Sequence, residues 1–525
     1  MTAILTIKDY SLDYVTRAGQ NRVLDQLNLT INKGKVLGLV GESGSGKTSL
    51  AWAIMRYLPK NARETPQGLL SLADLDLKKA SPATLGSLRG NRLSMVFQDP
   101  STALNPTLTI GRQVTEVLER HRGLSGEEAK EEALRILTNV ELRNPGALMK
   151  RYPHEASGGE KQRVLIATAF ACQPELLIFD EPTTALDVIT GARILDLFAK
   201  LREETGVAAL YISHDLALVS RVADDVAVLE KGKIVEEATG ASIFQSPVHP
   251  YTRKLVDAVP RPDRRLTTDS SKGDSLLKAS NIEVFYYRKK WFSPRPPAAT
   301  DKVSFDIRPG EILGVVGESG SGKSSMARAL TGLADFAGEV SFGGKKILSD
   351  RQMDQGYRRG VQIIFQHPDT SLNPRQTVHQ ILSRPIKLYG GDLNSIPDLL
   401  EEVRLPRDYA SRYPHQLSGG EKQRVAIARA FAAKPELVIC DEITAPLDVS
   451  VQASVVDLLL KLRKDNGTAY MFISHDINLV CQIAHRIAVM RNGALLDLLD
   501  VEQIRSGNVH PYTRELIETT PTPVS

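Results

Sequence analysis

The chain has 525 residues, of which 42% are hydrophobic and 24% are charged, an ordinary composition for a globular protein of roughly two to four domains. Its 66 basic and 62 acidic residues leave a net charge of only +4, so no overall basic field indicates binding to nucleic acid. Three cysteines, Cys172, Cys440 and Cys481, stand far apart without metal-ligand spacing, which predicts a reduced, cytosolic compartment and buried thiols.

The N-terminal stretch is not expected to be a targeting segment, because Lys8 and Asp9 interrupt the apolar core that a signal peptide needs. No run of about 18 apolar residues occurs in the sequence, so we expect no transmembrane helix. If the protein works at a membrane, another chain must provide the spans.

The first strong motif follows a short apolar run, residues 35–40 (KVLGLV), which is typical of a buried parallel strand. This run leads directly into GESGSGKT at 41–48, which fits the G-x-x-x-x-G-K-[ST] pattern of a phosphate-binding loop. In that pattern the glycines let backbone N–H groups surround a phosphate, Lys47 reaches the β- and γ-phosphates, and the Thr48 hydroxyl binds Mg²⁺. Helix-compatible sequence follows the loop, as the pattern requires.

A helical region and a glycine-centred loop come next along the chain. Residues 125–137 (SGEEAKEEALRIL) begin with a capping-box pattern, Ser125 to Glu128, and continue as an amphipathic helix. The loop YPHEASGGEKQR then occupies residues 152–163.

Two further apolar runs end in polar residues. Residues 175–181 (ELLIFDE) end in two acids, and the first, Asp180, stands where a carboxylate that orients Mg²⁺ belongs. Glu181 follows, and by strand alternation we expect it on the opposite side, placed to polarise a water in line with the γ-phosphate. Residues 208–215 (AALYISHD) are a third such run, and their His214 is interpreted as a contact to the γ-phosphate.

All of these features return in the second half of the chain. The phosphate loop recurs as GESGSGKS at 317–324, at an offset of 276 residues. The later motifs recur at a constant offset of 261 residues: YPHQLSGGEKQR at 413–424, ELVICDE at 436–442, AYMFISHD at 469–476 and, after HPYTR at 249–253, a second HPYTR at 510–514. A period of this length indicates a duplicated domain. We predict a first domain over 1–260, a polar linker over 261–275 and a second domain over 276–525.

Together the motifs resemble those of the ATP-binding cassette (ABC) family, over nearly the whole chain. The resemblance implies an α/β fold of two tandem P-loop ATP-binding cassette domains, with ATP and Mg²⁺ as cofactors. Each domain would have a RecA-like α/β core, an antiparallel β subdomain and a helical subdomain that includes 125–137 or 395–403. The glycine-centred loops at 152–163 and 413–424 resemble the signature loops of this family. In the family the two domains pair head to tail and each signature loop covers the ATP of the other domain, so the chain itself would supply both halves of the ATPase dimer.

The resemblance assigns roles to individual residues. Catalytic roles fall on the Walker B glutamates, the switch histidines and the Q-loop glutamines: Glu181, Glu442, His214, His475, Gln98 and Gln366. Mg²⁺ would be held by Thr48, Gln98, Asp180, Ser324, Gln366 and Asp441. Nucleotide contacts fall on the phosphate loops, signature loops, D-loops and two upstream aromatics: Gly41, Ser43, Gly44, Ser45, Gly46, Lys47, Thr48, Ser49, Gly317, Ser319, Gly320, Ser321, Gly322, Lys323, Ser324, Ser325, Ser157, Gly158, Gly159, Ser418, Gly419, Gly420, Asp187, Asp448, Tyr14 and Tyr286. The two tyrosines would stack on adenine, although a tyrosine in a strand is more often part of the packing.

Residues 97–106 (FQDPSTALNP) and 365–374 (FQHPDTSLNP), with the HPYT motifs, are similar to the ATPases of dipeptide, oligopeptide and nickel importers. This implies an ATP-hydrolysing subunit that drives uptake of peptides or peptide-like solutes. It would act peripherally at the cytoplasmic face of the inner membrane with two transmembrane permease subunits and an extracytoplasmic solute-binding protein. Some such relatives carry an iron–sulfur centre on cysteines after HPYT. Neither segment after HPYT contains cysteine here, so we expect no cluster.

Two alternatives stay open from the sequence. A soluble twin-cassette ATPase that acts on ribosomes or nucleic acid is the second functional reading, but such proteins usually join their cassettes by a long charged helix. The linker here is short and polar, and we expect no nucleic-acid partner. Residues 286–297 (YYRKKWFSPRPP) either touch an acidic membrane surface or form an exposed hairpin insertion. The sequence does not identify the solute.

Overall fold

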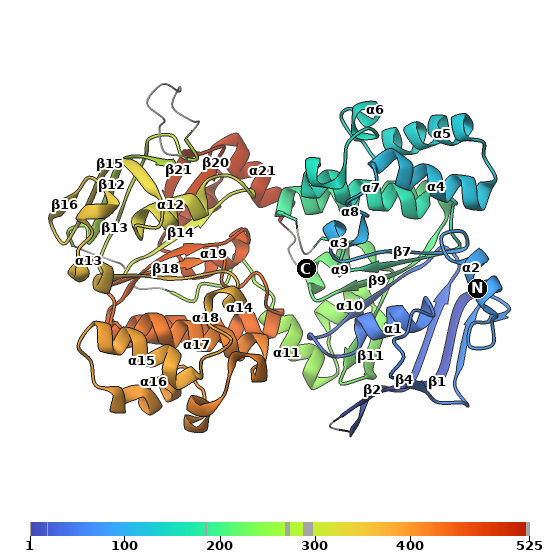
Figure 1. Ribbon diagram of the computed structural model, residues 1–525, viewed down its shortest axis with the longest axis horizontal. Helices are drawn as coiled ribbons and strands as arrows, with labels where there is room; N and C mark the ends of the chain where they lie inside the picture. The colour runs from blue at the N-terminus through green and yellow to red at the C-terminus, as the bar shows by residue number, and fades with distance from the viewer. Residues whose placement is uncertain (1, 18, 184–185, 268–272, 287–297, 521–525) are drawn as a thin grey trace. The chain divides into compact units, whose positions relative to one another are not determined.

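The computed structural model describes residues 2–17, 19–183, 186–267, 273–286 and 298–520, and it has the α/β architecture expected from the sequence (Figure 1). The chain divides into two compact units, Met1–Val259 and Pro260–Thr520. Residues 286–297, interpreted as either a membrane contact or an exposed hairpin insertion, and the predicted linker over 261–275 lie partly outside the described residues. No helix in the described parts of the chain is both long enough and apolar enough to cross a membrane.

The first unit is built around a six-stranded sheet in the order β11-β10-β3-β9-β8-β7. Neighbouring strands from β10 to β7 are parallel, and β11 is added antiparallel at the edge. The strands are β3 (Val36–Val40), β7 (Leu93–Val96), β8 (Leu176–Asp180), β9 (Ala208–Ser213), β10 (Asp225–Glu230) and β11 (Lys233–Thr239). Every residue of β3, β8 and β9 is buried, which is why these strands are continuous apolar runs in the sequence.

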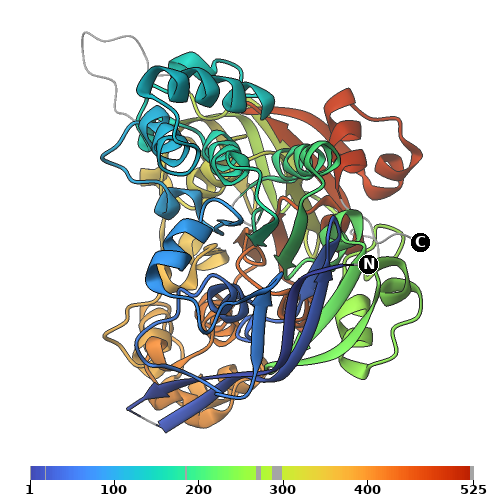
Figure 2. The same ribbon diagram turned by 90° about the vertical axis from the view of Figure 1, so that its right-hand side faces the viewer.

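An antiparallel sheet in the order β2-β1-β5-β6, with β4 paired to β1, forms the second layer of this unit. Its strands are β1 (Ala3–Thr16), β2 (Gly19–Asn32), β4 (Ala62–Glu64), β5 (Leu69–Leu72) and β6 (Leu75–Asp76), and Figure 2 shows the long β1–β2 ribbon. This sheet shares one apolar core with the central sheet and with α1 (Lys47–Ile54), the helix that follows the phosphate loop. The phosphate loop is therefore fixed between two sheets.

Helices cover the other face of the central sheet. Phe179 of β8 packs edge-on against Phe198 of α8 (Val188–Thr205), with ring centroids 4.7 Å apart. A side chain at Gly38 of β3 would lie 2.2 Å from Val219 of α9 (Leu216–Val222), so glycine is needed there for the helix to approach. The remaining helices of the unit are α2 (Pro82–Leu88), α3 (Pro100–Ala103), α4 (Ile110–Arg122), α5 (Gly126–Asn139), α6 (Pro145–Leu148), the 3-10 turn η1 (Pro153–Glu155), α7 (Gly158–Phe170), α10 (Gly240–Gln245) and α11 (Pro250–Ala258).

The second unit repeats this plan. Its central sheet has the order β17-β18-β19-β14-β20-β21 and its antiparallel sheet the order β13-β12-β15-β16. The strands are β12 (Leu277–Phe285), β13 (Val303–Ile307), β14 (Ile312–Val316), β15 (Asp335–Phe342), β16 (Lys345–Ile347), β17 (Val361–Ile364), β18 (Leu437–Asp441), β19 (Ala469–Ile473), β20 (Arg486–Arg491) and β21 (Ala494–Asp500). The helices are α12 (Lys323–Leu330), η2 (Asp350–Gln352), α13 (Gln355–Gly360), α14 (Pro368–Ser371), α15 (Val378–Leu388), η3 (Leu393–Ser395), α16 (Ile396–Glu402), η4 (Arg407–Ser411), η5 (Pro414–Gln416), α17 (Gly419–Phe431), α18 (Val449–Asn466), α19 (Ile477–Ile483), α20 (Val501–Ser506) and α21 (Pro511–Thr519).

The helical regions account for part of the difference in length between the halves. The predicted helix over 125–137 is present as α5, and Ser125 and Glu128 form the predicted capping box. Its counterpart α16 has 7 residues where α5 has 14, and it starts after a 3-10 turn without a side-chain cap from Ser395. The offset between the halves accordingly falls from 268 at the Q-loop glutamines to 261 at the glycine-centred loops.

The first described part of the predicted linker is hydrogen-bonded to the second unit. The last carbonyls of α19 lack partners inside the helix, as at every helix C-terminus. Three consecutive residues supply donors to three consecutive carbonyls there, each at 2.8–2.9 Å: the Arg265 guanidinium, the Leu266 N–H and the Thr267 hydroxyl bond the oxygens of Cys481, Gln482 and Ile483. Residues 265–267 therefore cap α19 in addition to continuing the chain.

Candidate nucleotide sites

Each phosphate loop joins a buried parallel strand to the first turn of a helix. In the first unit α1 starts after Gly46, which has a φ of 111°. Lys47 is only 5% exposed, and its Nζ donates to the carbonyl oxygens of Gly41 and Glu42 at 2.7 and 3.0 Å. Lys323 makes the same two bonds in the second unit, at 2.8 Å each. Both ammonium groups are therefore enclosed by the loop that would surround a phosphate.

The loop backbone is shaped so that only glycine fits at key positions. A side chain at Gly41 would lie 2.2 Å from the carbonyl oxygen of Leu229, and one at Gly317 would lie 2.1 Å from that of Met490. The buried hydroxyl of Ser45 has no hydrogen-bond partner among the described residues. Buried hydroxyls are normally satisfied, so this donor fits a phosphate oxygen of a bound nucleotide.

A hydroxyl and a carboxylate meet beside each lysine, as a magnesium site requires. Thr48 Oγ1 donates to Asp180 Oδ1 at 3.2 Å, and Ser324 Oγ donates to Asp441 Oδ1 at 2.8 Å. Burial raises the pKa of Asp180 to about 6, the adjacent Glu181 carboxylate adds to the rise, and the bond from Thr48 opposes it. A cation next to Asp180 would reverse this shift. One carboxylate and one hydroxyl are a small protein ligand set, which suits Mg²⁺ because it keeps water and phosphate ligands.

The Walker B glutamates lie near other predicted site residues, but strand alternation, the reason that we expected, does not account for their positions. Strand alternation does not place them, because β8 and β18 end at the preceding aspartates. Glu181 and Glu442 instead adopt a left-handed backbone, each with a φ of 49°. The turn directs Glu181 Oε2 to Gln98 Nε2 at 2.9 Å and to His214 Nδ1 at 3.1 Å.

The second unit has the corresponding arrangement. Gln366 Nε2 donates to Glu442 Oε2 at 3.1 Å, and Glu442 Oε1 lies 3.7 Å from Lys323 Nζ. The buried Ser474 follows β19 and His475 comes next, which matches the position of His214 after β9 in the first unit. In each unit the lysine, the acidic pair and the glutamine thus gather at the carboxyl ends of parallel strands, where open α/β sheets bind ligands.

The signature loops are exposed helix N-termini. Ser157 caps α7 and Ser418 caps α17, each through a reciprocal capping box with the glutamate three residues later. A side chain at Gly159 would lie 2.9 Å from Thr190, and one at Gly420 would lie 2.8 Å from Val451. The second glycine of each loop is therefore required because the next helix, α8 or α18, packs against it. Gly158 and Gly419 stay exposed with Ser157 and Ser418.

The D-loop aspartates are the N-caps of those next helices. Asp187 accepts hydrogen bonds from the N–H and the hydroxyl of Thr190 at 2.9 and 3.1 Å. Asp448 holds the N-cap position of α18, where the residue matching Thr190 is Val451, which has no hydroxyl. The signature loop and the D-loop are therefore packed against each other within each unit.

The two tyrosines predicted to stack on adenine make matching contacts. The Tyr14 hydroxyl bonds Ser49 Oγ at 3.2 Å and the Tyr286 hydroxyl bonds Ser325 Oγ at 2.8 Å. Tyr14 is half-buried and Tyr286 is 51% exposed. Each ring therefore lies near the first turn of the helix that follows its phosphate loop, and its stacking on adenine stays a prediction.

Sequence reasoning missed two tyrosines that contact the phosphate loops. The hydroxyl of Tyr251 accepts the backbone N–H of Glu42 at 3.0 Å, and that of Tyr512 accepts the N–H of Glu318 at 3.0 Å. Both belong to the repeated HPYTR sequence. Its recurrence at the same offset as the catalytic motifs was the signal that could have pointed to them.

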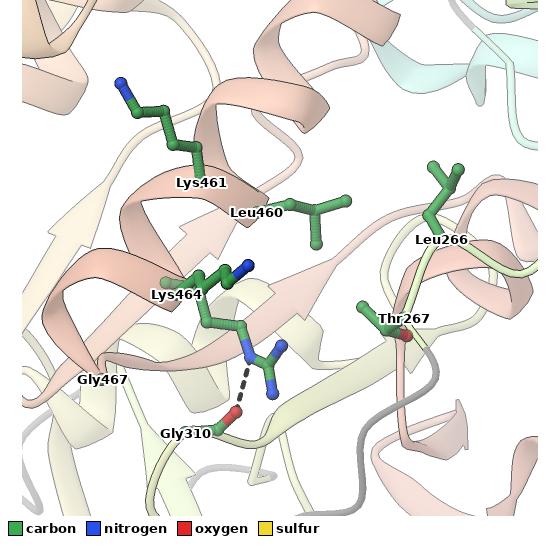
Figure 3. Close-up of a pocket in the computed structure, with 8 residues that line it drawn as sticks. Leu266, Thr267, Gly310, Leu460, Lys461, Lys464 and Gly467 are labelled. Carbon is green, nitrogen blue, oxygen red and sulfur yellow. Dashed lines mark hydrogen bonds between the residues drawn. The ribbon is translucent and has the colours of Figure 1, made fainter.

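A separate cavity of about 720 Å³ lies in the second unit (Figure 3). Leu266 and Thr267 border one side and the last turns of α18 the other, and Arg463 of that helix donates to the carbonyl of Gly310 at 2.6 Å. The lining residues are Leu266, Thr267, Gly310, Leu460, Lys461, Arg463, Lys464 and Gly467. None of them belongs to the predicted nucleotide sites.

Comparison with known proteins finds matching families in both halves. The model of the ABC transporter family matches residues 24–184 and 300–445, and that of the oligopeptide/dipeptide transporter C-terminal region matches residues 235–302. The chain is 40% identical to the peptidoglycan transport ATP-binding protein YejF of Agrobacterium fabrum, over 98% of this chain and 96% of that protein.

It is also 38% identical to the glutathione import ATP-binding protein GsiA of Escherichia coli K12, over 99% of this chain and 89% of that protein. Among solved structures, a dimeric ATP-binding cassette in a post-hydrolysis state bound to ADP and Pi is 29% identical. It covers 45% of this chain and 98% of its own, with a TM-score of 0.41.

Proposed function

The chain belongs to the ABC transporter family and is the ATP-hydrolysing subunit of an importer, and we propose that its solute is a peptide or peptide-like compound. The relatives named for peptidoglycan transport and glutathione import support this class of solute. The match of residues 235–302 to an oligopeptide/dipeptide transporter region favours import over a soluble twin-cassette ATPase.

One observation carries the further proposal that both units bind and hydrolyse ATP. Each unit brings a phosphate-loop lysine, a paired hydroxyl and carboxylate, and a glutamate bonded to a glutamine to one edge of its central sheet. No member of this set is replaced by an inert residue in either unit: Lys47, Thr48, Asp180, Glu181 and Gln98 correspond to Lys323, Ser324, Asp441, Glu442 and Gln366.

The residues divide the chemistry of phosphate transfer to water. Bound Mg–ATP supplies the phosphoryl group. Lys47 would neutralise the β- and γ-phosphate oxygens, while Thr48 and Asp180 would hold Mg²⁺, whose positive charge would offset the charge that develops on the phosphates. Glu181 accepts the proton of the attacking water, and Gln98 and His214, which already contact this carboxylate, orient it. The corresponding residues of the second unit act in the same way.

We further propose that each exposed signature loop covers the nucleotide of the other unit. Ser418, Gly419 and Gly420 would act on the ATP held by Lys47, and Ser157, Gly158 and Gly159 on the ATP held by Lys323. An exposed helix N-terminus presents free N–H groups and a partial positive charge, which favours binding of a γ-phosphate. ATP would then close the pair of units and hydrolysis would release it.

The proposed assembly places this chain at the cytoplasmic face of the inner membrane. Two permease subunits would form the solute path and an extracytoplasmic binding protein would deliver the solute. Coupling would run through the Q-loop segments and helical regions, as the family resemblance implies.

Two measurements test the proposal. Equilibrium binding of Mg–ATP to the purified chain should reach two per chain, and Lys47→Ala and Lys323→Ala should each remove one. Loss of one charge-assisted phosphate contact should raise the dissociation constant about ten- to hundredfold. In cells that lack the chain, uptake of labelled peptides or glutathione should return with the wild type and not with the Glu181→Gln, Glu442→Gln double variant. Saturation at one ATP, or no peptide-like solute whose uptake depends on the chain, would contradict it.

A further inference from the structure

One peptide unit of each phosphate loop is held from both sides. In the first unit it joins Gly41 to Glu42. Its carbonyl oxygen accepts a hydrogen bond from Lys47 Nζ at 2.7 Å, and its N–H donates to the Tyr251 hydroxyl at 3.0 Å. The C=O and N–H of a trans peptide point in opposite directions, so Lys47 and Tyr251 fix the rotation of the same plane.

Tyr251 is itself anchored, so its hydroxyl is a fixed point. It is 8% exposed and lies in the first turn of α11. His249 is the N-cap of this helix, and its Nδ1 accepts a hydrogen bond from the Tyr251 N–H at 3.3 Å. The N–H groups of Val248 and His249 donate to the carboxylate of Glu236 on β11 at 2.8 and 2.9 Å. The sequence HPY therefore places the tyrosine through its own cap and through the edge strand of the central sheet.

The second unit repeats the arrangement. Glu318 N–H donates to the Tyr512 hydroxyl at 3.0 Å, while Lys323 Nζ donates to the carbonyl of Gly317 at 2.8 Å. Tyr512 is 2% exposed, and the Arg491 guanidinium lies over its ring at 4.4 Å from the centroid. The recurrence of the same contact in two domains of different sequence indicates that the hydroxyl has a role beyond filling space.

We propose that Tyr251 and Tyr512 are positioning residues for phosphate binding, each acting on the phosphate loop of its own unit. The hydroxyl holds the Gly–Glu peptide in the orientation in which the loop lysine and the loop N–H groups face the phosphates. Each HPYT segment thereby contributes to the nucleotide affinity of its own unit. This inference rests on the proposed function, because it takes Lys47 and Lys323 to be the phosphate contacts.

The size of the effect follows from losing one hydrogen bond. Phenylalanine keeps the ring and its packing and removes only the hydroxyl, which leaves the loop N–H without its acceptor. A single neutral hydrogen bond of this kind corresponds to about a two- to tenfold change in an equilibrium constant. The bond holds the empty loop in its binding conformation, so its loss lets the loop populate other conformations before nucleotide arrives. KM for ATP should therefore rise by up to that factor, while kcat at saturating ATP stays within about twofold.

The test measures each site by itself in the full-length chain. In the Lys323→Ala background only the Lys47 site binds, and fluorescent mant-ATP with Mg²⁺ reports its affinity. There, Tyr251→Phe should weaken binding about two- to tenfold and Tyr512→Phe should leave it unchanged. In the Lys47→Ala background the two tyrosine variants should exchange roles. Tyr389→Phe is the matched control, because its hydroxyl donates to the backbone carbonyl of Arg358 in the second unit at 3.1 Å.

The outcomes separate this inference from the proposed function. If each lysine variant removes one site but neither tyrosine variant changes the affinity of the site in its own unit, the inference is overturned and the proposed function stands. If both tyrosine variants, or Tyr389→Phe as well, weaken both sites equally, the effect is a general loss of structure and the inference is again overturned. If the lysine variants leave two sites of unchanged affinity, both the site assignment and the inference are wrong.

Discussion

The two nucleotide sites should hydrolyse ATP at different rates, because the two halves differ beside their catalytic motifs. Pro182, next to Glu181, is matched by Ile443, and both side chains are buried. Pro446, near the second D-loop, is matched by Ala185, which lies outside the described residues. A proline fixes φ and removes an N–H, so it should change how the second D-loop meets its partner.

The signature loops differ in packing as well. Leu417 precedes Ser418 and is 6% exposed, whereas the corresponding Ala156 is 9% exposed. The three additional carbons of a buried leucine are worth on the order of 2 kcal/mol, so the loop with Leu417 is held more firmly. In the proposed pairing that loop covers the ATP of Lys47. We therefore expect the Lys47 site to be the faster one.

The glutamate variants turn this expectation into numbers. Replacement of a general base typically lowers the rate of hydrolysis at its own site by about 10²–10⁴-fold. The ATPase activity that remains in a glutamine variant therefore comes from the other site. A difference of about 2 kcal/mol, if fully expressed in the barrier, corresponds to about thirtyfold in rate. Even a third of it leaves the Lys47 site about threefold faster. Glu181→Gln should thus retain at most about a quarter of the ATPase rate, and Glu442→Gln at least about three quarters.

Steady-state phosphate release from the two single variants, measured side by side with saturating Mg–ATP, decides the matter. Both variants must still bind two nucleotides per chain, which shows that only the chemical step changed. Neither site should be inactive, since both glutamates are present in the wild type. Equal losses, which strict coupling of the sites would also produce, or a larger loss from Glu442→Gln, would refute the reasoning.

Three further outcomes are expected. Replacing Gln98 and Gln366 together by alanine should spare ATP affinity but uncouple hydrolysis from solute uptake, and unchanged solute-stimulated ATPase activity in the assembled transporter would count against this. The pKa of Glu132 is lowered from 4.5 to about 2, chiefly by hydrogen bonds from Arg135 and then Arg122, so its folded-state pKa lies below the unfolded value. Glu132→Gln should therefore destabilise the chain by about 1 kcal/mol or less at neutral pH, with the difference from wild type fading as the pH falls from about 4.5 to about 2 in urea unfolding. Thr267→Val keeps the shape of a side chain that is 4% exposed but removes the hydroxyl that donates to the Ile483 carbonyl. This loss should cost about 1–3 kcal/mol locally and speed hydrogen exchange of the Leu266 N–H. An unchanged exchange rate would show that the cap contributes nothing to local stability.

Local sequence was sufficient to predict the strands and the helix start that carry or adjoin the motifs. The runs at 35–40, 175–181 and 208–215 are buried strands β3, β8 and β9, because parallel strands covered on both faces admit few polar residues. Ser125 with Glu128 fixes the start of α5, since a capping box needs only residues within one turn. The duplication was readable from the spacing of the motifs alone.

The direction of the Walker B glutamates could not be derived in this way. Strand periodicity placed Glu181 opposite Asp180, but β8 ends at Asp180 and Glu181 adopts a left-handed backbone. Its N–H donates to the carbonyl of Ile212 on β9 at 2.9 Å, a residue about thirty positions away along the chain. A contact between neighbouring strands sets this turn, and no local pattern reports it.

The sequence by itself determined the motifs of this protein: two phosphate loops, two acidic pairs and two glycine-centred loops, each encoded within a few adjacent residues. Only the tertiary structure decided what holds those groups in place. Tyr251 reaches the peptide of Glu42 from more than two hundred residues away, and residues 265–267 cap a helix that starts at Ile477. Hydrogen bonds between distant segments depend on where the folded sheets bring the chain, so no spacing in the sequence specifies them.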